Sequence, residues 1–155
     1  MAVEIERKFL LKNQDWKTIA DSGVNIKQGY LNSHIERVVR IRLHGNKGVL
    51  TVKGKTNHTS RLEFEYEIPF NEAVEMLALC EKPIIDKIRY EVDFENNTWE
   101  IDVFDGENKG LIVAEVELSD ENQKIEIPSW IGEEVSHDSK YYNAALINFP
   151  FSKWT

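Results

Sequence analysis

Charged side chains of like sign recur two residues apart along the chain. Glu4 and Glu6 form one such pair, and Arg40 and Arg42 form another. Residues at i and i+2 of a strand lie on the same face, so the two charges repel each other unless a ligand of opposite charge lies nearby. Carboxylate pairs suit a hard divalent cation, whereas pairs of bases suit an anion. Further pairs of this kind include Lys53/Lys55, Glu63/Glu65, Lys87/Arg89 and Glu115/Glu117.

The two kinds of charge also concentrate in different parts of the chain. Residues 36–55 contain six bases and one acid, whereas residues 91–134 contain fourteen acids and two bases, in a chain of net charge -8. If faces of opposite sign look at each other across a closed barrel, they suit a ligand that combines a metal with a polyvalent anion, such as a metal polyphosphate. The alternative interpretation is that these are the solvent-exposed faces of an ordinary antiparallel sheet.

Strands must position most of these side chains, because apolar and polar residues alternate along most of the sequence. The alternation predicts strands at 4–10, 38–44, 50–55, 62–68, 87–94, 100–103 and 114–118, joined largely by hairpin turns. Helices are expected at 14–22, at 71–80 with Asn71 as the N-cap, and at 139–148. With 155 residues, the chain is expected to form one α+β domain that is mainly antiparallel β.

Several other classes of site and partner are excluded or disfavoured. Cys80 is the only cysteine, so no internal disulfide can form, and a reducing cytoplasm is the expected location. No apolar N-terminal stretch resembles a signal peptide, and the net negative charge predicts neither a nucleic-acid nor a membrane partner. The segment 48–56 resembles a phosphate-binding P-loop only superficially, because its glycine spacing is wrong and no helix is expected to follow it.

An ordered set of motifs resembles the CYTH superfamily, the triphosphate tunnel metalloenzymes. The first motif is Glu-x-Glu-x-Lys, at Glu4, Glu6 and Lys8. The others follow in the family's order and cover nearly the whole chain: Gln28-Gly29-Tyr30-Leu31, Arg40-Ile41-Arg42, Thr51-Val52-Lys53, Arg61-x-Glu63-x-Glu65, Lys87-Ile88-Arg89-Tyr90, Asp102, Glu115-Val116-Glu117 and Asp138 to Asn143. The resemblance implies an eight-stranded closed β-barrel with a few flanking helices, formed as a single tunnel domain over residues 1–155.

The resemblance also implies roles for individual residues. Mg²⁺ or Mn²⁺ would be bound by Glu4, Glu6, Asp102, Glu115 and Glu117. The phosphate oxygens would be bound by Lys8, Arg40, Arg42, Lys53, Lys87, Arg89 and Lys140. Glu63 and Glu65 match family positions, but the resemblance leaves open whether they bind metal or orient the bases. Lys8 and Tyr30 are the candidates for proton transfer, since a lysine among other cations releases its proton more readily.

The predicted activity is hydrolysis of a small-molecule linear triphosphate, above all inorganic tripolyphosphate, by metal-activated water. The short chain favours this substrate because it leaves little surface for a nucleoside or thiamine pocket. A class IV adenylate cyclase and a thiamine triphosphatase are alternative activities, and a noncatalytic polyphosphate-binding module is an alternative of another class. The sequence leaves open whether the protein is a homodimer, and it does not choose between the two metals.

Overall fold

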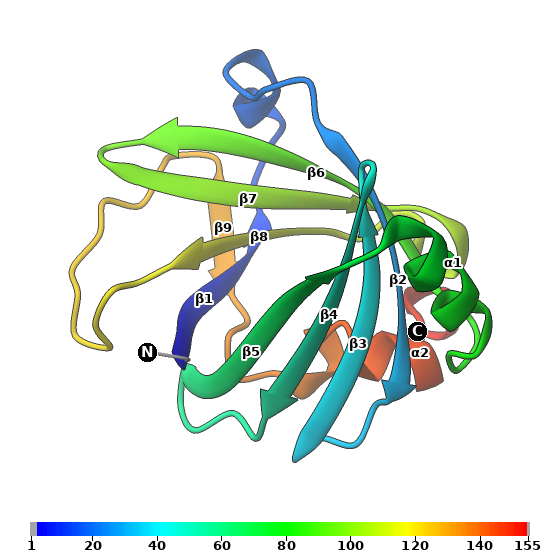
Figure 1. Cartoon of the computed structure of the whole chain (residues 1–155). Coiled ribbons are helices and arrows are strands. Elements are labelled where there is room, and N and C mark those ends of the chain that lie inside the picture. The colour runs from blue at the N-terminus through cyan, green and yellow to red at the C-terminus, as the bar shows by residue number, and fades with distance from the viewer. Residues whose placement is uncertain (1–2, 155) are drawn as a thin grey trace.

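Antiparallel strands form almost all of the regular structure in the computed structural model, which describes residues 3–154 (Figure 1). The strands are β1 (Val3–Leu11), β2 (Val24–Asn32), β3 (Arg37–His44), β4 (Lys47–Gly54), β5 (Ser60–Ile68), β6 (Ile85–Phe94), β7 (Asn97–Phe104), β8 (Ile112–Glu117) and β9 (Ile131–Glu134). The helices are α1 (Phe70–Ala78) and α2 (Ala145–Asn148), with short 3-10 turns at Asp15–Thr18, Gly106–Asn108, Ser139–Tyr141 and Phe151–Lys153.

Eight of these strands close into a barrel. They follow the order β5-β4-β3-β2-β6-β7-β8-β1, and β1 pairs with β5 to complete the ring. Among residues 3–154, three registered pairs make that closure: Val3 with Leu62, Glu4 with Arg61, and Ile5 with Ser60. The short strand β9 adds to β1 as a ninth strand. The predicted eight-stranded antiparallel barrel is therefore confirmed, with one additional strand.

The apolar faces of the strands point out of the barrel, so the hydrophobic cores lie between the barrel and the segments that cover it. One core contains Trp16, Trp99 and Trp130 and lies against β1, β6, β7 and β8. A second forms where α2 packs against Ile85 and Val113, and a third where α1 packs against β3 and β4. Each large apolar side chain buried in this way contributes about 1.5–3 kcal/mol to stability.

Several predicted elements differ from those observed. The predicted helix at 14–22 is only a 3-10 turn, and the one at 139–148 is divided into a 3-10 turn and the short α2. Helix α1 begins at Phe70 after Pro69, so Asn71 is not its N-cap. Strands β2 and β9 were not among the predicted strands. The inner face of β2 carries Gln28 and Tyr30, which weakens its apolar–polar alternation.

The helices are short. None of those in residues 3–154 has the length and apolar character needed to cross a membrane.

Candidate active site

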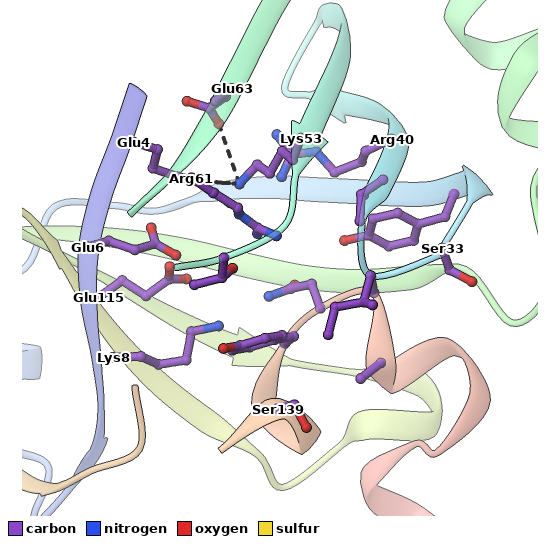
Figure 2. A pocket seen from close by; sticks show the side chains of 18 of the residues that line it. Glu4, Glu6, Lys8, Ser33, Arg40, Lys53, Arg61, Glu63, Glu115 and Ser139 are labelled. Carbon is purple, nitrogen blue, oxygen red and sulfur yellow. Dashed lines mark hydrogen bonds and ion pairs between the residues drawn. The ribbon is translucent and has the colours of Figure 1, made fainter. Parts of the chain in front are cut away.

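A cavity of about 690 Å³ occupies the inside of the barrel. All eight barrel strands contribute side chains to its wall, as do the segment from Ser136 to Phe149 and the connections β2–β3 and β4–β5. In Figure 2, Glu4, Glu6 and Lys8 extend from β1 into this space, with Glu115 beside them and Lys53, Arg61 and Glu63 on another part of the wall. Both members of five of the like-charged pairs named above line this cavity, so solvent-exposed sheet faces are the wrong interpretation for them. The pair Lys53/Lys55 is the exception, because Lys55 is exposed and does not line the cavity.

Carboxylates from β1 and β8 are crowded together on one part of the wall. Burial, together with repulsion from Glu115 and Glu4, raises the pKa of Glu6 well above its usual value. Burial alone would raise the pKa of Glu115, but attraction from Lys8, a hydrogen bond with Glu6 and attraction from Arg89 lower it to about 2. Burial and repulsion from Glu4 also raise the pKa of Glu117. A bound cation would relieve this repulsion, because it neutralises several carboxylates at once.

The carboxylates are not preassembled into a closed cage. Among residues 3–154, no three or more carboxylate, histidine or cysteine side chains are arranged to hold a metal ion. Glu4, Glu6, Glu115 and Glu117 nevertheless line the same cavity, and their hard oxygen atoms suit Mg²⁺ or Mn²⁺. Water or substrate oxygens would have to complete the coordination. The donor set therefore fits a divalent metal that is bound together with an anionic substrate.

Two arginines on β3 keep unused hydrogen-bonding capacity in the basic wall, although Arg40 also forms an ion pair with Glu65. Arg42 has no carboxylate partner within the described residues; its Nε donates a hydrogen bond to Gln28 Oε1 at 2.7 Å. Burial and repulsion from Arg40 and Arg89 lower the pKa of Arg42 to about 9. The Nε atom of Arg40 is buried and has no hydrogen-bond partner in the part of the chain described. Since a buried donor without a partner is costly, both guanidinium groups favour an anion in the cavity.

Other bases are already paired with acids, so the two charge sets are less separate than the sequence suggests. Lys53 Nζ lies 2.9 Å from Glu4 Oε2 and 3.4 Å from Glu63 Oε2. Arg40 Nη2 lies 3.3 Å from a carboxylate oxygen of Glu65, whose side chain is 47% exposed. Glu63 and Glu65 thus contact bases in this structure. This favours the orienting role that the resemblance left open for them.

Asp102 lies outside the cavity lining, behind two of the bases. Its carboxylate accepts hydrogen bonds from Lys87 Nζ at 2.7 Å and from Arg89 Nε and Nη2 at 2.8 and 2.9 Å. Burial would raise its pKa, but the attraction of Lys87 and Arg89 holds the pKa of Asp102 far below its usual value. The structure does not bring Asp102 together with the other predicted metal ligands, because these two bases occupy its oxygen atoms.

The two residues predicted for proton transfer have separate partners. Lys8 Nζ donates to the carbonyl of Tyr141 at 3.1 Å and lies 5.6 Å from the centre of the Tyr142 ring. Tyr30 accepts a hydrogen bond from Gln28 through its hydroxyl at 3.1 Å. Burial raises the pKa of Tyr30, although Arg40 and Arg42 oppose the rise. Both side chains line the cavity, but Tyr142 is the aromatic ring beside Lys8.

Lys140 is the one predicted phosphate-binding residue that the cavity lining lacks. Its ammonium lies over the ring of Trp154, 4.7 Å from the ring centre, and 5.4 Å from the centre of the Tyr141 ring. These cation–π contacts hold Lys140 among the aromatic residues of the C-terminal segment. The other six predicted phosphate-binding residues all line the cavity: Lys8, Arg40, Arg42, Lys53, Lys87 and Arg89.

Further residues of the site had no role predicted from the sequence. Arg61 and Glu100 line the cavity, and period-two spacing from Glu63 and Asp102 could have identified them. Tyr142 and Asn143 lie in a segment without strand periodicity, so only the family motif Asp138 to Asn143, and no local periodicity, points to them.

Comparisons with known proteins agree with this architecture. A family model described as the CYTH domain matches residues 2–144. An inorganic triphosphatase of Acetivibrio thermocellus is 48% identical over 155 residues, which is 99% of each chain. An inorganic triphosphatase of Nitrosomonas europaea is 33% identical over 150 residues, covering 92% of this chain and 95% of that protein.

A solved structure shares the fold as well. A crystal structure of an inorganic triphosphatase, 30% identical in sequence, superposes with a TM-score of 0.65 over 92% of this chain and 96% of its own. The family match, the near full-length relatives and the charged barrel together establish that this chain belongs to the CYTH domain family.

Proposed function

We propose that the protein is a metal-dependent triphosphatase that hydrolyses a linear triphosphate, with inorganic tripolyphosphate as the preferred substrate. The observation that carries the proposal is the juxtaposition, inside one cavity, of under-neutralised arginines and mutually repelling carboxylates. Each set alone is unfavourable, and a metal-bound triphosphate would satisfy both. The relatives described as inorganic triphosphatases support the same activity.

In this proposal the arginines and lysines bind the phosphate chain. Arg40 and Arg42 supply guanidinium groups with free hydrogen-bonding capacity, and Lys87 and Arg89 are held in place by Asp102. Since phosphoryl transfer spreads negative charge over the transferring group, an array of fixed cations stabilises the transition state. Lys8 and Tyr30 stay the candidates for moving a proton at the leaving or attacking oxygen.

The carboxylates of β1 and β8 would hold Mg²⁺ or Mn²⁺, with Glu6 and Glu115 nearest each other and with Glu4 and Glu117 on the same wall. When bound, such a metal neutralises phosphate oxygens and makes a bound water more acidic. Asp102 has the different role of fixing the two bases of β6.

The remaining expectations about the molecule belong to the same proposal. We place the activity in one domain over residues 1–155, in the cytoplasm, acting on a small molecule without nucleic acid. A homodimer stays an open alternative.

The test compares kcat/KM for tripolyphosphate, ATP, thiamine triphosphate and pyrophosphate with Mg²⁺ or Mn²⁺, with and without EDTA. Tripolyphosphate is expected to be best, and pyrophosphate poor, because a shorter anion leaves part of the cationic wall unpaired. EDTA is expected to abolish turnover. Cyclic AMP as the main product from ATP would instead identify a cyclase, and tight binding without turnover would identify a noncatalytic binding module.

A further inference from the structure

Gln28, on β2, makes three hydrogen bonds inside the barrel although its side chain is fully buried. Its Oε1 accepts from Arg42 Nε at 2.7 Å, the shortest contact that the Arg42 guanidinium makes among the described residues. Its Nε2 donates to the hydroxyl of Tyr30 and to Oδ1 of Asn143, both at 3.1 Å. Both N–H groups of the amide donate and its oxygen accepts once, so the buried side chain is held firmly, because solvent does not compete for these partners.

Asn143, from the C-terminal segment, continues the same network. Its Oδ1 accepts a second hydrogen bond, from Lys87 Nζ at 2.9 Å. The two amides therefore connect Arg42 of β3 to Lys87 of β6 through a continuous chain of hydrogen bonds. None of the four residues in this hydrogen-bonded path is negatively charged. The nearest carboxylate bonded to the path is that of Asp102, which accepts from Lys87.

The neutrality of the two amides is the important property. Arg42 and Lys87 repel each other, as shown by the contribution of Arg42 to lowering the pKa of Lys87. A carboxylate between them would hold them in place but would also cancel the charge that an anionic ligand needs. An amide oxygen fixes a cation through a hydrogen bond and leaves its net charge intact.

We infer that Gln28 and Asn143 are positioning residues, which hold Arg42 and Lys87 at a fixed separation as charged anchors for the triphosphate. The inference rests on the proposed function for the identity of the anion. Because Asn143 belongs to the segment that completes the cavity wall, the network also ties that segment to the bases of the barrel.

The first experiment measures tripolyphosphate binding by calorimetry in EDTA, and KM and kcat with Mg²⁺, for Gln28→Met and Gln28→Glu. Methionine keeps the approximate shape but removes every hydrogen bond, and we expect a weakening of about tenfold, or about 1.4 kcal/mol. Glutamate keeps an acceptor for Arg42 but cancels its charge, so affinity is expected to fall to a similar extent. Affinity equal to that of the unmodified protein in both variants would overturn the inference.

A matched control separates positioning from general loosening of the structure. Asn108 is an equally buried amide that also anchors the C-terminal segment, since its Oδ1 accepts from the backbone N–H of Phe151 at 2.8 Å. Asn108→Ala is expected to lower the melting temperature without changing KM. Asn143→Ala is expected to raise KM, and its effect should add incompletely to that of Gln28→Met, because both act through one network.

A readout independent of the substrate is a crystal structure of each Gln28 variant without ligand. The Arg42 guanidinium is expected to leave its position in Gln28→Met and to keep it in Gln28→Glu. An unmoved Arg42 in Gln28→Met would overturn the inference even if tripolyphosphate binds. If the unmodified protein neither binds nor hydrolyses tripolyphosphate in the presence of Mg²⁺, the proposed function fails, and the position of Arg42 in these structures still decides the role of Gln28.

Discussion

Glu115 stands at the border between the acidic and basic parts of the cavity wall. Lys8 and Arg89 attract its carboxylate, and Glu6 shares a hydrogen bond with it. We expect Glu115→Gln to reduce metal-dependent turnover on the order of a hundredfold, because the amide removes the charge that would hold the metal. Steady-state kinetics over a range of Mg²⁺ concentrations measures the effect, with circular dichroism to confirm folding. Glu133→Gln, on the exposed part of β9, is the control and should be unaffected. Full activity of Glu115→Gln at low Mg²⁺ would contradict a metal role.

Lys87 makes the cavity sensitive to pH near neutrality. Burial, opposed by the attraction of Asp102 and reinforced by repulsion from Arg89 and Arg42, lowers the pKa of Lys87 to about 7. The ammonium is charged below that pH and neutral above it, so tripolyphosphate affinity is expected to fall as pH rises from about 6 to about 8.

The ligand also titrates in this range, and Lys87→Met provides the correction because both proteins bind the same ligand. The ratio of the two affinities, measured by calorimetry, should be largest at low pH and shrink above about pH 7. A ratio that stays constant from about pH 6 to about pH 8 would contradict this account of Lys87.

Sequence reasoning succeeded best for residues whose role follows from strand periodicity. Glu4, Glu6 and Lys8 all point into the cavity because they share one face of β1. Periodicity could not show that Lys140 lies away from the cavity lining, because no strand fixes its direction and its aromatic partner Trp154 lies fourteen residues further along the chain. Asp102 was correctly placed on the charged face of β7, but spacing alone could not show that Lys87 and Arg89 occupy it.

At the scale of elements, Asp102 fastens β7 to β6. These strands pair along their whole length, and Asp102 stands opposite Arg89 in the register. We expect Asp102→Asn to reduce the free energy of unfolding by about 3–5 kcal/mol at neutral pH, because two buried bases lose their counter-ion. Urea denaturation measures this loss.

The same comparison has a defined pH dependence. Because the pKa of Asp102 is lower in the folded than in the unfolded protein, its stabilisation is complete above the unfolded value of about 3.9 and is lost as pH falls below it. The difference between the two proteins should therefore shrink below about pH 4. Asp105→Asn, at an exposed position just after β7, is the control and should change stability by less than about 0.5 kcal/mol.

Strand β2 and the end of α1 approach each other closely at Gly29. A Cβ at this position would lie 2.7 Å from Cβ of Cys80 and 3.2 Å from Cδ1 of Leu77. We expect Gly29→Ala to destabilise the protein by about 1–3 kcal/mol, since either the strand or the helix must move. Gly54→Ala is the comparison, because its Cβ would meet only Leu62 at 3.6 Å. Thermal denaturation of both variants decides the point, and equal melting temperatures would contradict the close packing.

The sequence predicted strands better than helices. Strands β3, β4 and β6 have strong alternation over most of their length and lie close to the predicted ranges. By contrast, the residues at 14–22 pack Trp16 into a core beside β6 without needing a regular helix. Local periodicity does not reveal tertiary contacts of this kind, although they stabilise a short 3-10 turn such as the one that carries Trp16.

For the whole molecule, the distribution of charge reverses the usual arrangement of a small domain. The barrel interior is polar and holds the ligand cavity, so the apolar faces point outward, and all but that of β5 depend on α1, α2 and the connecting segments for burial. Alternation in the sequence predicted that each strand has two different faces. Alternation could not by itself decide which face points into the barrel. The repulsion between like charges and the family resemblance indicated that the charged face does.

The pairing of β1 implies an order of events during synthesis. This strand comes first among the described strands, yet its partners are β5, β8 and β9, which begin at residues 60, 112 and 131. Contacts so distant along the chain form slowly, because long loops must close before any pairing compensates for them. Val3, Glu4 and Ile5 can pair with β5 once it is made, but the pairing of Glu6 and Lys8 with β8 has to wait until residue 117 has been synthesised. The backbone amides of β1 should be among the last to gain protection in a pulsed hydrogen-exchange experiment, so that a nascent chain acquires its anion-binding cavity only at the end of folding.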